Sequence, residues 1–198
     1  MGGRSRGASS AQRADRRLSL GGFGSAWHLA VRFFGALSPA GPSPQDACWA
    51  EECLSPPERE LFARMSGPDR RHGIGVARDA LRLALEDGLS ESELPPGFAA
   101  AGLLHDVGKV RSRLGTFGRV LATVLAIGFG RSRACRWQGR FGSEVAKYLA
   151  HDRIGAELLE ASGSDQFTVR WAREHHLPAE AWQLDRVIAG YLKEADGD

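Results

Sequence analysis

The chain has 198 residues, which at roughly 150 residues per domain predicts one domain with an appendage. Hydrophobic residues make up 42% of the sequence, enough for a packed core, so a wholly disordered protein is excluded. The formal net charge of +2 is too small for a chain that binds nucleic acid over its whole surface. No apolar run reaches about 18 residues, so we expect no membrane span.

The N-terminal part differs in composition from the rest. Residues 1–25 hold five arginines against one acid, Asp15, and have no apolar periodicity, which predicts a disordered basic tail. We divide the rest into an N-terminal helical extension (26–66), a main domain (67–193) and an acidic C-terminal end (194–198). The three cysteines lack the spacing of a zinc site, and we interpret them as reduced thiols of a cytoplasmic protein: Cys48, Cys53 and Cys135.

Helix signals follow one another from residue 43 onward. Ser55-Pro56-Pro57-Glu58 offers an N-cap, a proline at the first helical position and a capping-box glutamate. Pro68 opens a second helix, and Gly88 ends it. Strand patterns are nearly absent, so we predict an all-α fold, a single compact helical domain. Further helices are expected over these residues: 98–107, 141–150, 154–161, 169–174 and 179–192.

One basic segment lies between Asp106 and Glu144, where the sequence has no acidic residue. One interpretation is a solvated linker around a core helix. Another is a basic rim for an anionic substrate, with Arg111 and Arg113 as candidate substrate-binding residues. Contact with a membrane surface or a nucleic acid is a third, but we do not expect a nucleic-acid partner.

The pair His105-Asp106 carries the main chemical signal. It follows the apolar run 99–104, and a charged pair at the end of a buried helix is costly unless something compensates it. A divalent cation compensates it, because a carboxylate is anionic and a neutral imidazole is a good ligand. A single histidine is usually a helix-end or surface residue, but five in one ordered set favour a metal site: His72, His105, His151, His175 and His176, with Asp185 following them.

This order resembles the HD superfamily of metal-dependent phosphohydrolases, whose pattern is His…His-Asp…Asp. The string Leu-Leu-His-Asp-Val-Gly-Lys at 103–109 is characteristic of that family. His151 and the pair His175-His176 resemble the binuclear branch, in which extra histidines hold a second metal. The Gly-Tyr-Pro string of the cyclic-dinucleotide phosphodiesterases is missing, and residues 177–180 read Leu-Pro-Ala-Glu in its place. The four positions that match the family pattern in order are His72, His105, Asp106 and Asp185.

The resemblance implies one or two divalent metal ions per chain. Asp106 would bridge two ions, His72, His105 and Asp185 would bind the first, and His151 with one or both of the paired histidines would bind the second. This donor set is compatible with Mn, Fe, Co, Ni, Mg or Zn. The candidate catalytic residues are Asp106 and Lys109. Lys109 lies four residues after His105, on the same face if the helix continues. It would neutralise a substrate phosphate or orient the metal-bound water; the alternative is a solvated lysine at a helix end.

The predicted function is that of a metal-dependent phosphohydrolase. We expect a phosphomonoesterase or phosphodiesterase whose partner is a nucleotide or another small phosphorylated substrate. Two alternatives stay open: a di-iron oxygenase of the HD type, and a non-catalytic regulatory module that keeps the metal for stability.

Overall fold

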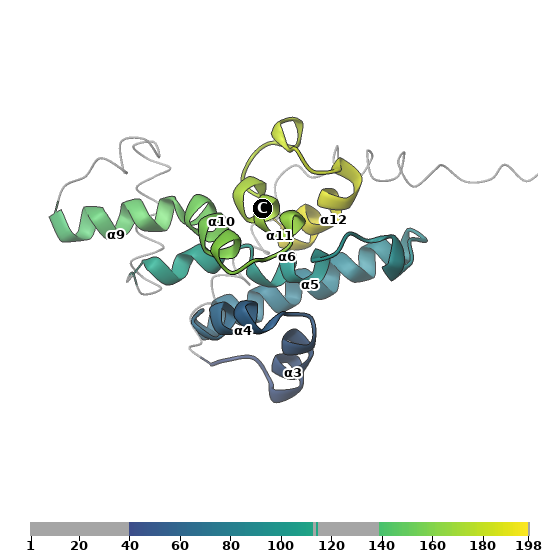
Figure 1. Ribbon diagram of the computed structural model, residues 1–198, viewed down its shortest axis with the longest axis horizontal. Coiled ribbons are helices and arrows are strands. Elements are labelled where there is room, and N and C mark those ends of the chain that lie inside the picture. The colour runs from purple at the N-terminus through teal and green to yellow at the C-terminus, as the bar shows by residue number, and fades with distance from the viewer. Residues whose placement is uncertain (1–39, 113, 115–138, 198) are drawn as a thin grey trace, which may run out of the picture.

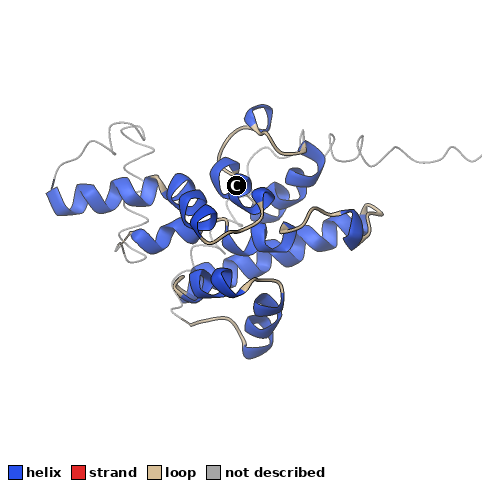
Figure 2. Ribbon diagram, viewed as in Figure 1, coloured by secondary structure: helices blue, strands red, loops and turns tan. Residues whose placement is uncertain are grey.

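The structure is a computed structural model that describes residues 40–112, 114 and 139–197. Within these residues every regular element is a helix, as Figure 2 shows. The predicted all-α fold is therefore confirmed. The predicted basic tail (1–25), Cys135 and Arg113 lie outside the described residues. Among the described helices none is both long enough and apolar enough to cross a membrane.

Three helices form the first part of the described chain: α3 (Pro44–Glu52), α4 (Pro56–Ala63) and α5 (Gly67–Glu86). Each is preceded by a serine N-cap and has proline in its first turn. At α4 the predicted capping box is present, because the main-chain nitrogen of Ser55 donates to the Glu58 carboxylate at 2.9 Å. The local sequence thus defines where these helices begin.

The second part holds shorter elements. These are η1 (Glu91–Glu93), α6 (Phe98–Leu104), η2 (Val107–Arg111), α9 (Gly139–Leu149), α10 (His151–Ala161), α11 (Gln166–Glu174), η3 (Ala179–Ala181) and α12 (Arg186–Asp196). Several predicted helices differ from the observed ones in extent. Helices α10 and α11 each begin three residues earlier than predicted, at His151 and Gln166. The helix expected over 98–107 ends at Leu104. The helix expected over 179–192 is divided into η3 and α12. Asp185 caps the start of α12, because its carboxylate accepts hydrogen bonds from the main-chain nitrogens of Val187 and Ile188.

Helix α6 lies at the centre of the packing. It contacts α5 on one side and α11 on another, while α12 packs on α5 and α10 packs on both α11 and η2 (Figure 1). Six of the seven residues of α6 are buried: Phe98, Ala100, Ala101, Gly102, Leu103 and Leu104. The residues that follow α6, His105 and Asp106, are therefore carried to the middle of the fold.

Close contact between α5 and α6 depends on glycine. A Cβ atom at Gly73 would lie 2.5 Å from the main-chain oxygen of Leu103, and one at Gly102 would lie 2.7 Å from the Cα of Ala77. Real Cβ atoms do not approach other atoms this closely, so the two helices would have to separate. At Gly75, two residues further along α5, an added Cβ atom would have no other atom within 4 Å outside the helix's own backbone.

These two glycines of α5 make a matched test of the packing. We expect Gly73→Ala to lower the free energy of unfolding by about 1–3 kcal/mol, because α6 must shift to admit the methyl group. Gly75→Ala should raise it slightly, by about 0.5–1 kcal/mol, because alanine is the better helix former at an open position. Urea unfolding of both variants measures the difference. Equal stabilities would show that the contact between α5 and α6 does not require glycine at position 73.

Candidate metal centre

The structure brings five histidines and two aspartates from five parts of the chain into one cluster. His72 lies on α5, His105 and Asp106 follow α6, and His151 is the first residue of α10. His175 and His176 follow the last residue of α11, and Asp196 is the last residue of α12. The rings form a continuous chain, because His105 contacts His72 and His175, each with ring centroids 5.2 Å apart.

The first group consists of His72, His105 and Asp196, whose candidate ligand atoms all lie within 4.8 Å of one another. The Nε2 atom of His72 is 2.9 Å from Oδ1 of Asp196, and the Nε2 atom of His105 is 3.7 Å from the same oxygen. His105 and Asp196 are buried, while His72 is half-buried. This arrangement of two imidazoles and a carboxylate matches the donors that transition metals and zinc bind.

Asp185, predicted as a ligand, is not in this group. Its side chain is exposed, and its Oδ1 accepts hydrogen bonds from the main-chain nitrogens of Val187 and Ile188 at 2.9 and 3.1 Å. It is the N-cap of α12, and Asp196, eleven residues later, occupies the place expected for it. Residues 194–196, predicted as part of a separate acidic end, are the last turn of that helix.

A sequence signal for Asp196 does exist. Ala189, Leu192 and Asp196 are spaced three and four residues apart, so they share one face of a helix, and the structure buries all three. A carboxylate on the apolar face of a helix needs a compensating partner, which singles out Asp196. Asp185 instead precedes a helical run directly, as N-cap residues do.

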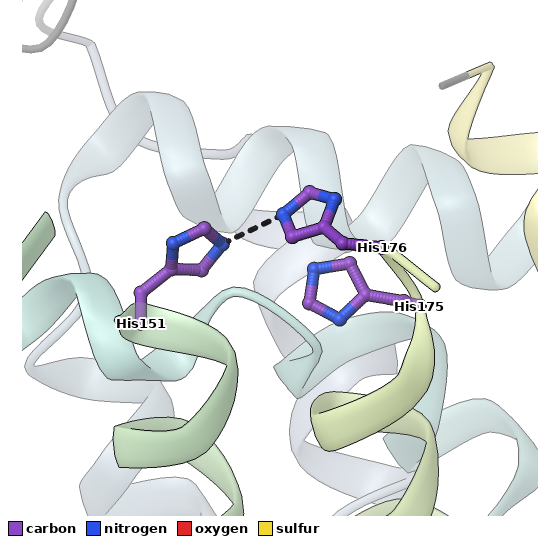
Figure 3. Close-up of side chains that lie close together, drawn as sticks. All are labelled: His151, His175 and His176. Atoms are coloured by element: carbon purple, nitrogen blue, oxygen red, sulfur yellow. Dashed lines mark hydrogen bonds between the residues drawn. The ribbon is translucent and has the colours of Figure 1, made fainter. Parts of the chain in front are cut away.

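The second group consists of His151, His175 and His176. In Figure 3 His151 reaches across from the start of α10 toward the histidine pair at the end of α11. The Nε2 atoms of His151 and His176 are 3.0 Å apart. Two nitrogens bound to one metal at about 2.0–2.1 Å lie about 2.9–3.4 Å from each other, so this separation suits a shared ion. His175 is fully buried, and His176 is exposed.

Three of the histidines are oriented by the same contact. The Nδ1 atoms of His105, His151 and His175 each donate to the main-chain oxygen three residues earlier, at 2.7–2.9 Å. Each acceptor lies in the last turn of a helix, where carbonyl groups lack partners within the helix. The hydrogen bond places the proton on Nδ1, which leaves Nε2 as the ligand atom facing the cluster.

Asp106 lies between the two groups. Its Oδ1 is 3.3 Å from Nε2 of His151, and its Oδ2 is 3.5 Å from Nε2 of His105. Burial by itself raises the pKa of Asp106, but opposing electrostatic effects, of which the charge of Lys109 is the largest, hold that pKa well below its usual range. The carboxylate is therefore ionised at neutral pH, with one oxygen directed to each group.

The cluster has the properties of a cation site. With Nδ1 protonated, the Nε2 lone pairs of His105 and His151 face carboxylate oxygens, an arrangement that a cation between them stabilises. The Nε2 atom of His175 is buried and has no hydrogen-bond partner among the described residues. Burial lowers the pKa of His175 to about 3, so its imidazole is neutral and can act as a ligand. The residues present therefore fit a divalent metal.

The Lys109 ammonium is ion-paired with Oδ2 of Asp106. The helix does not continue from His105, as the same-face prediction required, but η2 brings Lys109 back to Asp106. Burial lowers the pKa of Lys109, while Asp106 raises it by more, so the amine is charged. The contact of η2 with the start of α10 depends on Gly108, where a Cβ atom would lie 1.9 Å from the main-chain oxygen of His151.

One known family matches most of the described chain. The sequence model of the HD domain matches residues 70–196, which is more than half of the chain. The chain belongs to the HD domain family. The match includes α12 as far as Asp196. No curated protein and no solved structure matches the chain in the corresponding comparisons. HD domains are mostly metal-dependent hydrolases, and this HD domain has His/Asp groups that could hold divalent metal ions.

The aspartates at the two ends of α12, the N-cap Asp185 and the last residue Asp196, allow a matched test of this HD domain. Asp196→Asn should weaken binding of Co²⁺ at least tenfold, because it removes a charged ligand atom from the first group. Asp185→Asn should bind Co²⁺ as the wild type does, since asparagine also serves as an N-cap. Isothermal titration of both variants distinguishes them, and the reverse order of affinities would restore Asp185 as the ligand.

The low pKa of His175 predicts a pH-dependent stability for the metal-free HD domain. The unfolded chain has an ordinary histidine pKa near 6.5, so between about pH 6.5 and 3 it binds more protons than the folded chain. Stability should therefore fall as the pH falls through this window, by on the order of 2 kcal/mol at pH 5 from this group. Urea unfolding with a chelator at pH 7.5 and 5 measures the loss, which should be smaller in His175→Gln; an identical loss in that variant would assign it to other groups.

Proposed function

We propose that the chain is a metal-dependent phosphohydrolase that acts on a nucleotide or another small phosphate ester at a binuclear centre. The observation that carries this proposal is the position of Asp106. Its two oxygens face different histidine groups, 3.3 Å from His151 and 3.5 Å from His105. A carboxylate shared in this way suits a bridge between two cations, and it keeps their combined charge compensated in a buried site.

The proposed ligand sets follow the two groups. His72, His105 and Asp196 hold one ion, His151, His175 and His176 hold the other, and Asp106 contributes to both. When bound, two divalent ions supply a hydroxide nucleophile at neutral pH and bind phosphoryl oxygens. Mn, Fe, Co, Ni, Mg and Zn are the candidates for such mixed imidazole and carboxylate ligands.

Lys109 has the second catalytic role in this proposal. Its ammonium is ion-paired with Asp106, so η2 places a positive charge next to the cluster. There it attracts an anionic phosphate ester and keeps the Asp106 carboxylate ionised. Arg111 ends η2 with an exposed side chain, and it is proposed to extend this positive surface toward the substrate. Arg113, also proposed to bind substrate, lies outside the described residues.

Metal content and turnover test the proposal together. The wild-type chain, purified without chelator and loaded with Mn²⁺ or Fe²⁺, should bind two ions and release phosphate or a nucleoside phosphate from a panel of nucleotides and phosphate esters. Asp106→Ala should lose at least nine tenths of this activity, because the shared carboxylate is removed. His151→Ala should bind one ion fewer, while Asp185→Asn, which changes a carboxylate outside the centre, should match the wild type.

Other results would favour other functions. One bound ion in fully loaded wild type would indicate a mononuclear hydrolase. Oxygen uptake by the iron-loaded chain, without release of phosphate, would favour the di-iron oxygenase. Full metal loading with no turnover on the whole panel would favour a regulatory module in which the metal contributes only stability.

A further inference from the structure

A lysine of the C-terminal helix contacts the main chain of the histidine pair. The Nζ atom of Lys193, on α12, donates to the main-chain oxygen of His175 at 2.9 Å. The two residues are 18 positions apart, and the bond joins the end of α11 to the last turn of α12. It gives a helix-end carbonyl of α11 a charged donor.

This carbonyl belongs to the peptide bond that links the two histidines. Because the peptide is planar, a hydrogen bond to its oxygen fixes the rotation of the whole unit about its two ends. The orientation of this peptide sets the direction of the Cα–Cβ bond of His176 relative to that of His175. The preceding carbonyl, of Glu174, is held separately by the indole nitrogen of Trp182 at 3.1 Å and the main-chain nitrogen of Leu177 at 2.8 Å.

The same helix also serves the first group. Lys193 and Asp196 are three residues apart on α12, so their side chains share a face. Asp196 reaches His72, while Lys193 reaches the carbonyl between His175 and His176. Helix α12 therefore contacts both groups. Asp196 places a carboxylate oxygen in the first group, and Lys193 donates a hydrogen bond to the main chain of the second.

We propose that Lys193 is a positioning residue that aligns His175 and His176 for one metal ion. The proposal rests on the binuclear centre of the proposed function. A positioning role and a purely electrostatic role for Lys193 predict opposite changes in metal affinity when the lysine is removed. A nearby ammonium repels a metal ion, so if only its charge mattered, removing Lys193 would tighten metal binding. If Lys193 positions the histidines, removing it weakens binding, and only at the group that contains His175 and His176.

The test uses Co²⁺ as the probe and isolates each group. The His72→Ala chain keeps the three-histidine group, and the His151→Ala chain keeps the other. Lys193→Met and Lys193→Arg are placed in each background and titrated with Co²⁺, with its visible absorption as the signal. Arg186→Met is the matched control, because Arg186 is an exposed cation of α12 that also donates to a carbonyl, that of Glu180, at 3.4 Å.

We expect Lys193→Met to weaken Co²⁺ binding roughly tenfold in the His72→Ala chain, the range for losing a contact that orients a ligand. Lys193→Arg, which keeps a charged donor, should restore most of the affinity, and Arg186→Met should change nothing. In the His151→Ala chain Lys193→Met should leave the affinity within about threefold. Unchanged or tighter binding, or equal weakening in both backgrounds, would overturn the proposal.

Two further outcomes separate this inference from the proposed function. If the wild-type chain binds two Co²⁺ ions but Lys193→Met binds them equally well, the positioning role is wrong and the binuclear centre stands. If the wild-type chain binds no Co²⁺, both are wrong. Unfolding in the presence of chelator shows whether Lys193→Met folds; if it does not, Lys193→Gln replaces it, with the same expected order of affinities.

Discussion

The structure depends on how the buried carboxylate of Asp106 is compensated. An ionised carboxylate in a protein interior costs several kcal/mol unless charges or hydrogen bonds offset the loss of water. Here Lys109 forms an ion pair with one oxygen. The Nε2 atoms of His105 and His151 lie within 3.5 Å of the two oxygens, and a cation held between these groups would compensate the carboxylate further. This arrangement requires η2, α10 and the end of α6 to meet at one point, so the charge at the centre constrains the packing around it.

Most of the side chains in the cluster lie at the ends of helices rather than in their middle turns. His105 and His175 directly follow α6 and α11, His151 follows the turn after α9, and Asp196 ends α12. At such positions an imidazole satisfies an unpaired carbonyl through Nδ1 and keeps Nε2 for a ligand. One hydrogen bond thus completes a helix end and orients an atom that could bind a metal, which explains how three of the histidines can be buried together.

Small residues make this convergence possible. Gly73 and Gly102 let the main chains of α5 and α6 come into contact, and Gly108 lets η2 contact the first turn of α10. Larger side chains there would separate the elements by more than the few tenths of an ångström that a metal site tolerates. The all-helical core is therefore shaped around its central cluster, with the close contacts on the segments that carry His72, Asp106 and His151.

The fold class, the starts of the capped helices, and five histidines and one aspartate of the cluster are predictable from the amino-acid sequence. These follow from local signals: proline and serine at helix starts, and a charged pair after an apolar run. Tertiary packing places Asp196, and not Asp185, beside His72 and His105, although the spacing of Asp196 from Ala189 and Leu192 already favours its burial. It also decided the return of Lys109 to Asp106 and the bond from Lys193 to the His175 carbonyl. Such contacts join residues through the packing of separate helices, and helical periodicity alone does not specify which helix meets which.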